Sequence, residues 1–285
     1  EQGLCDILGV DCSATGMLDE WKAMAYHLDT LTEEVHIAMV GKYTDLSDAY
    51  LSVIKSLQHA AMAVDRKLII DWIEASHLED GWDDEEHKSA WSSLREAHGI
   101  LVPGGFGDRG IEGKIKAANY ARTEGVPYLG ICLGLQIATI EFCRNVLGMT
   151  GANSTEFEDN PEHAAVVFMP EISKTHLGGT MRLGSRPTLW QHDGSTIRSL
   201  YGPGDAVDER HRHRYEVNPD LIERIEGAGL VFVGKDESGQ RCEIFELNDH
   251  PYYVGVQFHP EFKSRPGKPS PPFPGLLKAA SNQLN

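Results

Sequence analysis

The chain has 285 residues, of which 41% are hydrophobic and 24% charged, a composition typical of a folded globular protein and unlike a disordered or fibrous one. Its net charge of −17, from 43 Asp and Glu against 26 Lys and Arg, disfavours nucleic acid or an anionic membrane as the main partner. No apolar run approaches the ~20 residues of a membrane span. The five cysteines are an odd number without C-x-x-C spacing, so we expect no disulfide framework, no thiolate zinc site and a reducing, cytoplasmic location.

Taken in chain order, apolar residues at helical spacing first predict a lead-in helix over 17–34. From residue 35 to residue 147, strand-like and helix-like segments alternate. The expected strands are 35–40, 68–73, 99–102 and 126–131, and the expected helices are 47–63, 89–97, 111–123 and 133–147. Such alternation is typical of a parallel sheet covered by helices on both faces.

The pattern changes after Gly148 to short β-rich runs, which either extend the same sheet or form a side layer. These runs are 164–169, 188–191, 230–233, 242–247 and 252–258. The proline-rich segment 265–274 is expected to be an extended connector to a last helix at 276–280. We therefore predict an α/β fold, with an open, mostly parallel sheet flanked by helices and extra β elements in the C-terminal half.

Cys132 lies in the most informative segment of the chain. It follows a buried strand, precedes a helix and has Gly130 and Gly134 two residues away on either side. This G-x-C-x-G pattern is the thiol counterpart of the G-x-S-x-G elbow, in which small neighbours allow a strained turn that presents a nucleophile. A helix N-terminus also lowers the pKa of a thiol placed there. We predict that Cys132 is a nucleophile and that Cys143 and Cys242 are structural.

His259 is the candidate base for this nucleophile. It ends an apolar strand, at the edge of an open α/β sheet where ligands bind, and Glu261 follows two residues later. A single His at a strand end is more often a capping or surface group. Its pairing with the elbow nevertheless favours Cys132, His259 and Glu261 as nucleophile, base and orienting carboxylate.

A glycine-rich loop at 103–110 also lies between a predicted strand and a predicted helix. It contains G-x-G-x-x-G, but no acidic residue ends a strand about 20 residues later, so a dinucleotide site is disfavoured. We interpret Gly105 as a backbone N–H donor to an oxyanion hole, together with the N–H of Leu133. A flexible turn between strand and helix stays open as the alternative.

Residues 210–214 read Arg-His-Arg-His-Arg. The two histidines lie two residues apart on an expected strand or turn, which disfavours a metal site. One basic patch in an acidic chain is poor evidence for nucleic acid. An arginine that holds a substrate carboxylate through its planar fork is the sharper interpretation. A solvated charged loop remains the alternative.

Together these segments resemble the class I glutamine amidotransferase family of triad type, and more narrowly the amidotransferase domains of the CTP synthase family. The general features are the Gly-Gly loop, the G-x-C-x-G elbow and the His-Pro-Glu element. The narrower resemblance rests on seven segments in the family's order: 40–43 (VGKY), 101–107 (LVPGGFG), 129–136 (LGICLGLQ), 152–157 (ANSTEF), 177–184 (LGGTMRLG), 209–218 (ERHRHRYEVN) and 257–262 (QFHPEF).

The resemblance implies roles for individual residues. Cys132, His259 and Glu261 match the catalytic triad, and Gly105 and Leu133 match the oxyanion hole. The positions that match the family's glutamine site are Gly104, Gly105, Phe106, Leu133, Gln136, Glu156 and Arg214. No metal is expected among these residues, and no cofactor is expected in this domain.

The resemblance also implies an activity and partners. Residues 35–285 are expected to form the amidotransferase domain, and residues 1–34 a lead-in helix or linker from an N-terminal synthase domain. Glutamine hydrolysis through a γ-glutamyl thioester would supply ammonia to that domain, which uses ATP and Mg²⁺ to aminate UTP to CTP. GTP is the expected allosteric activator, near Phe106 and the segment 177–184, and the full-length enzyme is expected to be a homo-oligomer. A stand-alone γ-glutamyl hydrolase and a catalytically silent regulatory domain are the alternatives.

Overall fold

The computed structural model describes residues 2–9, 16–42, 47–81, 84–170 and 181–284. Its α-helices are α1 (Gln2–Leu8), α2 (Gly16–Thr30), α3 (Leu51–Ala63), α4 (Glu85–Glu96), α5 (Ile111–Glu124), α6 (Leu133–Asn145), α7 (Thr196–Tyr201), α8 (Ile222–Gly227) and α9 (Pro272–Ala280). Its strands are β1 (Glu34–Gly41), β2 (Lys67–Glu74), β3 (Gly99–Val102), β4 (Tyr128–Ile131), β5 (Ala152–Ser154), β6 (His163–Phe168), β7 (Arg182–Trp190), β8 (Ala206–His213), β9 (Tyr215–Val217), β10 (Leu230–Lys235), β11 (Cys242–Leu247) and β12 (Tyr253–Val256).

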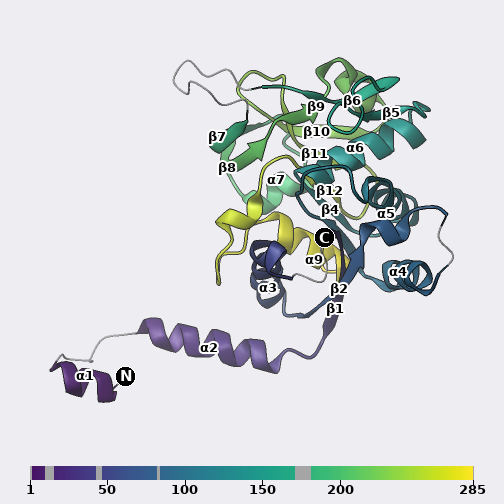
Figure 1. The fold of residues 1–285 in the computed structure, drawn as a ribbon. Coiled ribbons are helices and arrows are strands. Elements are labelled where there is room, and N and C mark those ends of the chain that lie inside the picture. The colour runs from purple at the N-terminus through teal and green to yellow at the C-terminus, as the bar shows by residue number, and fades with distance from the viewer. Residues whose placement is uncertain (1, 10–15, 43–46, 82–83, 171–180, 285) are drawn as a thin grey trace.

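The centre of the molecule is a nine-stranded sheet in the order β2-β1-β3-β4-β12-β11-β10-β7-β8. Strands β2, β1, β3, β4 and β12 run parallel, and the strands from β12 to β8 alternate in direction. Helices α3 and α9 pack together on one face, while α5 and α6 pack together on the other (Figure 1). This architecture confirms the predicted mostly parallel α/β sheet with additional β elements in the C-terminal half.

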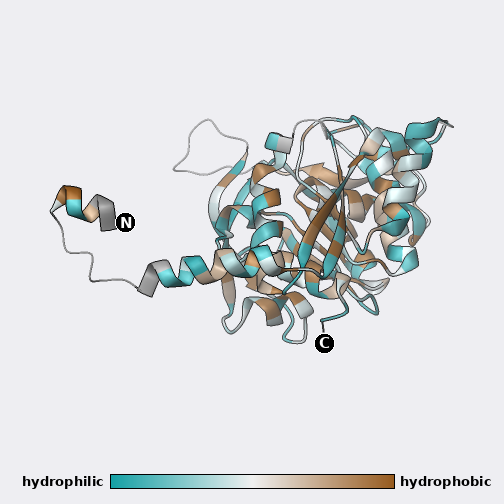
Figure 2. Ribbon diagram, turned by 90° about the horizontal axis from the view of Figure 1, so that it is seen from below, coloured by the Kyte–Doolittle hydropathy of each residue, from teal (hydrophilic) through white to brown (hydrophobic). Residues whose placement is uncertain are grey.

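Three of the parallel strands, β3, β4 and β12, are short and fully buried because helices cover both of their faces. All four residues of β3, of β4 and of β12 are buried, as expected for near-continuous apolar strands in a doubly covered sheet. Figure 2 shows hydrophobic strands in the interior and hydrophilic residues on the outward faces of the helices. The carboxyl ends of β3, β4 and β12 therefore meet at one edge of a rigid core.

Three strands form a separate sheet in the order β5-β6-β9, beside α6. The late β runs were expected either to extend the main sheet or to form a side layer, and they do both. Strands β5 and β9 were not predicted, and residues 210–214, which overlap the end of β8, were expected to form either a strand or a turn. β8 was hard to recognise because its exposed and buried residues alternate, but the buried ones are Glu209, His211 and His213 rather than aliphatic residues.

Two other differences concern helices and cysteines. The proline-rich segment is partly helical, since α9 begins at Pro272; prolines are tolerated there because the first-turn N–H groups lack helical partners. Cys5 in α1 is disulfide-bonded, which the cysteine count did not lead us to expect. Cys132, Cys143 and Cys242 are free and buried.

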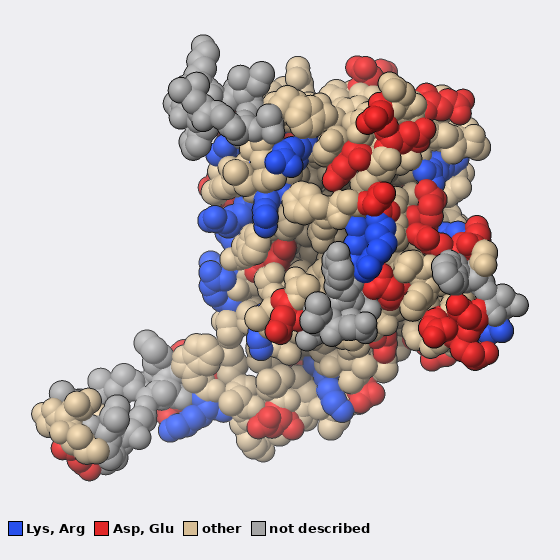
Figure 3. Space-filling view, in the orientation of Figure 1, with Lys and Arg blue, Asp and Glu red and all other residues tan. Residues whose placement is uncertain are grey.

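Helix α2 projects from the body and exposes Trp21, Tyr26 and Leu28 (Figure 1). On the face drawn in Figure 3, Lys and Arg side chains gather over β7 and β8 at the left of the view, whereas Asp and Glu side chains are most frequent at the right of the same face. Within the described part of the chain, no helix is both long and apolar enough to cross a membrane.

Candidate active site

Cys132 stands at the junction of β4 and α6 in a strained backbone conformation. Its φ of 52° and ψ of −98° lie outside the regions that non-glycine residues ordinarily adopt. The turn is possible because its neighbours are glycines: a Cβ on Gly134 would lie 2.2 Å from the carbonyl oxygen of Val102, and one on Gly130 would lie 2.6 Å from the backbone of Gly134. The predicted elbow is therefore present, with α6 beginning directly after the cysteine.

The register of β12 brings His259 to the same edge of the sheet. β12 is parallel to β4, with Val256 opposite Ile131, and the N–H of Cys132 donates to the carbonyl of Val256 at 2.7 Å. The imidazole Nδ1 of His259 lies 2.8 Å from Oε1 of Glu261, and both side chains are largely buried. The structure thus brings Cys132, His259 and Glu261 together, although 127 positions separate the first two in the numbering.

The electrostatics of His259 favour its charged form. Burial alone disfavours an imidazolium, but the charge and hydrogen bond of Cys132, together with those of Glu261, raise the pKa of His259 to about 10. A buried cation stays charged when opposite charges and acceptors surround it. At neutral pH the imidazole is therefore protonated, and it can release that proton to a leaving group.

The glycine-rich loop after β3 lies directly against these residues. A Cβ on Gly104 would lie 2.8 Å from Cε1 of His259 and 3.5 Å from Cβ of Cys132, and one on Gly105 would lie 3.5 Å from the side chain of Leu133. Only glycine at 104 lets the backbone approach the imidazole this closely. Gly105 and Leu133, the two expected oxyanion donors, are therefore neighbours in space.

Lys42 binds the backbone of the glycine-rich loop. Its buried ammonium donates to the carbonyl oxygens of Phe106 at 2.9 Å and Gly107 at 3.0 Å, and burial lowers the pKa of Lys42. Those two hydrogen bonds fix the carbonyl groups of Phe106 and Gly107. Lys42 belongs to the segment 40–43 that contributes to the family resemblance, but no role was predicted for it.

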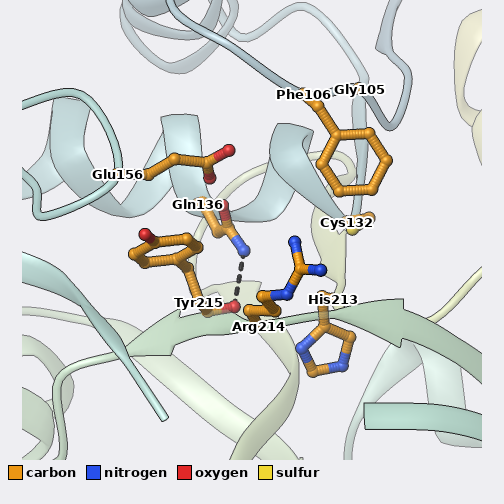
Figure 4. A pocket seen from close by; sticks show the side chains of 8 residues that line it. All are labelled: Gly105, Phe106, Cys132, Gln136, Glu156, His213, Arg214 and Tyr215. Carbon is orange, nitrogen blue, oxygen red and sulfur yellow. Dashed lines mark hydrogen bonds between the residues drawn. The ribbon is translucent and has the colours of Figure 1, made fainter. Parts of the chain in front are cut away.

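A small pocket opens beside the sulfur. Its lining residues come from the loop, the elbow, α6, the segment after β5 and the turn between β8 and β9: Gly105, Phe106, Cys132, Gln136, Glu156, His213, Arg214 and Tyr215. Figure 4 shows Gln136, Glu156 and Arg214 converging on the space beside Cys132, with Phe106 across from Arg214.

The pocket holds groups of both charges. Burial raises the pKa of Glu156, while the Gly107 backbone, Lys42 and Arg214 act in the opposite direction. The amide of Gln136 donates to the carbonyl of Tyr215 at 2.8 Å, which fixes α6 against the β8–β9 turn. A carboxylate and a guanidinium on opposite walls can hold the ammonium and carboxylate of an α-amino acid.

Most of the predicted glutamine-site residues therefore lie together, and two lining residues were missed. Gly104 lines a second, neighbouring pocket with Phe106, Arg212, His259 and Glu261. Leu133 is buried and lines neither pocket with its side chain. His213 and Tyr215 were missed, although their position on either side of Arg214 was a usable signal.

Other candidates from the sequence do not assemble a site. Burial raises the pKa of Cys143 to about 12 and that of Cys242 still further, which disfavours a reactive thiolate at either position. Among the described residues, no group of three or more His, Cys, Asp and Glu could hold a metal ion. Of the segment expected near GTP, residues 177–180 lie outside the described residues.

Comparison with known proteins agrees with this geometry. The model of the family described as glutamine amidotransferase class-I matches residues 45–279. The chain is 61% identical over 273 residues to a CTP synthase of Dictyostelium discoideum, covering 93% of this chain and 48% of that protein. It is 52% identical over 294 residues to human CTP synthase 1, covering 100% of this chain and 50% of that protein.

A solved structure described as the glutaminase domain of Trypanosoma brucei CTPS with bound acivicin superposes with a TM-score of 0.79. It shares 38% identity and covers 87% of this chain and 94% of the other. The chain therefore belongs to the class I glutamine amidotransferase family. Within that family it is similar to the glutaminase part of CTP synthases, and it spans about half the length of the curated relatives it matches.

Proposed function

We propose that this chain hydrolyses the side-chain amide of glutamine through Cys132, His259 and Glu261. The observation that carries the proposal is the position of the strained Cys132 at the N-terminus of α6, beside the imidazole of His259. The Nδ1 atom of that imidazole lies 2.8 Å from the carboxylate of Glu261. That arrangement is the nucleophile, base and orienting group of triad chemistry.

The reaction then follows from the charges of the site. The sulfur attacks the amide carbon, and the developing oxyanion receives the backbone N–H groups of Gly105 and Leu133. His259, protonated at neutral pH, gives its proton to the leaving ammonia. A γ-glutamyl thioester remains, and water activated by the neutral imidazole cleaves it to glutamate.

The head group of glutamine fits the charged walls of the pocket. Arg214 binds the α-carboxylate through its planar fork, and Glu156 binds the α-ammonium. Gln136, Gly104 and Phe106 complete the substrate site. Since Arg214 and Glu156 approach from different elements, they discriminate free glutamine from an amide without the amino-acid head group.

Beyond this domain, we propose that the ammonia serves an ATP- and Mg²⁺-dependent amination of UTP to CTP, as the relatives' name implies. The synthase part would precede residue 35, with α2 as the connection, and GTP would bind near Phe106 in the second pocket. The name of the relatives disfavours a stand-alone γ-glutamyl hydrolase. A homo-oligomer of the full-length enzyme and a cytoplasmic location belong to the same proposal.

Ammonia release from glutamine, measured with and without GTP, tests the proposal. Cys132→Ala should abolish release and leave the thermal unfolding midpoint nearly unchanged, because Ala keeps the turn without the sulfur. A glutamine-mimicking diazoketone should label Cys132 in the wild type. Labelling of Cys143 or Cys242 instead, or full activity of the Ala variant, would refute the assignment of the nucleophile.

A further inference from the structure

Gln257 is a fully buried polar residue to which the triad assigns no role. It follows β12, two residues before His259, and its side chain lies between Cys132 and Gln136. Its amide nitrogen Nε2 lies 3.6 Å from Sγ of Cys132, within reach of a hydrogen bond to sulfur. Its amide oxygen Oε1 lies 3.4 Å from Nε2 of Gln136.

The direction of these hydrogen bonds is fixed from outside the site. The carbonyl oxygen of Tyr215 can only accept, so the end of the Gln136 amide that faces it at 2.8 Å must be the NH₂ group. That same NH₂ group faces Gln257, which must therefore present its oxygen to Gln136. The remaining end of the Gln257 amide is the NH₂ group, and it faces the sulfur.

The sulfur consequently has a hydrogen-bond donor in addition to His259. Gln257 is held in place by its backbone, because its N–H donates to the carbonyl of Glu243 at 2.8 Å, and no part of its side chain is exposed. A rigid neutral donor in a dry site favours the negatively charged form of its acceptor. It also restricts the direction in which the Cys132 side chain points.

We propose that Gln257 is a further catalytic residue of this site: its side-chain amide donates to the Cys132 sulfur and stabilises and orients the thiolate. The inference deepens the proposed glutaminase function and rests on it for the identity of the nucleophile. A purely structural role for Gln257, as a buried amide that fills space between β12 and α6, is the competing explanation.

Alkylation of the intact chain by iodoacetamide as a function of pH, followed at Cys132 by mass spectrometry, distinguishes the two. This readout needs no glutamine turnover, so its failure is separate from failure of the glutaminase proposal. Gln257→Glu keeps an oxygen toward Gln136 and replaces the donor to sulfur by a carboxylate, whose charge also disfavours the thiolate. Gln257→Leu removes both contacts at similar volume, and Gln240→Leu, at an exposed glutamine, is the matched control.

We expect the midpoint of the alkylation profile to move to higher pH by about one unit in Gln257→Leu, the low end for a hydrogen bond to a charged group, and further in Gln257→Glu. Gln240→Leu should match the wild type. Glutaminase kcat should fall about tenfold in Gln257→Leu, with KM little changed. If Gln257→Leu fails to fold, Gln257→Met, which is also uncharged and has no N–H donor, takes its place. A profile that is unchanged in a folded Gln257→Leu or Gln257→Met variant would overturn the proposal and leave a space-filling role.

Discussion

Gly134 offers a direct test of how the core positions the nucleophile. In Gly134→Ala the new methyl group would lie 2.2 Å from the carbonyl oxygen of Val102, whereas ordinary contact begins near 3.4 Å. The obstacle is the backbone of a central strand, so relief requires α6 to move away from β3 by about 1 Å. Cys132 begins α6 and the loop with Gly105 follows β3, so this movement separates the nucleophile from the expected oxyanion donor.

The magnitudes predict a larger effect on reactivity than on stability. Overpacking costs about 1–3 kcal/mol, and the better helix propensity of Ala offsets about 1 kcal/mol of it. A misplacement of about 1 Å at the reacting atoms, by contrast, costs on the order of 100-fold in rate. We expect the unfolding midpoint to fall by a few degrees and labelling of Cys132 by a glutamine-mimicking diazoketone to slow about 100-fold.

Iodoacetamide provides the internal reference for this experiment, because it reacts with the thiolate without using the loop. Its rate at Cys132 should change much less than the diazoketone rate. Gly227→Ala is the matched control, since a Cβ there has no neighbour within 4 Å and the residue ends helix α8 far from the elbow. Equal diazoketone rates in Gly134→Ala and wild type would refute the argument that contact between α6 and β3 sets the geometry of the site.

Two further predictions concern the charged groups. Arg214→Lys keeps the positive charge but loses the planar guanidinium that donates two hydrogen bonds, so KM for glutamine should rise about tenfold at similar kcat. The control Arg224→Lys, at an exposed arginine of α8, should leave KM unchanged. A collapsed kcat at unchanged KM would contradict the binding of the glutamine head group by Arg214. Burial raises the pKa of Glu209 to about 7 from 4.5, so its contribution to stability is complete below pH 4.5 and is lost progressively as the pH rises from 4.5 through 7. Glu209→Gln should therefore match the wild-type unfolding free energy near pH 4 and exceed it by up to about 3 kcal/mol at pH 8 in urea titrations; an equal difference at both pH values would show that the carboxyl does not titrate.

The parallel half of the fold could be predicted from the sequence because each of its strands is a short apolar run. The expected strand 99–102 coincides with β3, and the other three differ from β1, β2 and β4 by at most two residues at either end. The C-terminal half could not be predicted equally well. β8 buries charged and imidazole side chains whose partners come from distant strands, such as Glu243 near His211, and no local pattern encodes those pairings.

The candidate site also has a part that the sequence predicts and a part that it does not. The elbow could be predicted because its strain requires glycines at fixed positions, and the strand end of His259 indicated the edge of the sheet. The contribution of Gln257 could not be predicted, since it depends on which end of its amide faces sulfur, and that direction is set by Tyr215 through Gln136. Such a chain of contacts exists only in three dimensions.

The basic segment of β8 shows how the fold changes the meaning of a sequence pattern. Strand alternation buries His211 and His213 and exposes Arg210 and Arg212. The two imidazoles lie 2.9 Å apart, nitrogen to nitrogen, and burial, together with the positive charge of Arg182 and of His259, holds the pKa of each well below its usual value. Both are therefore neutral at physiological pH. The positive charge that this segment offers to a ligand comes from its arginines alone, and the histidines beneath them add no further cation to a core that already contains Arg182.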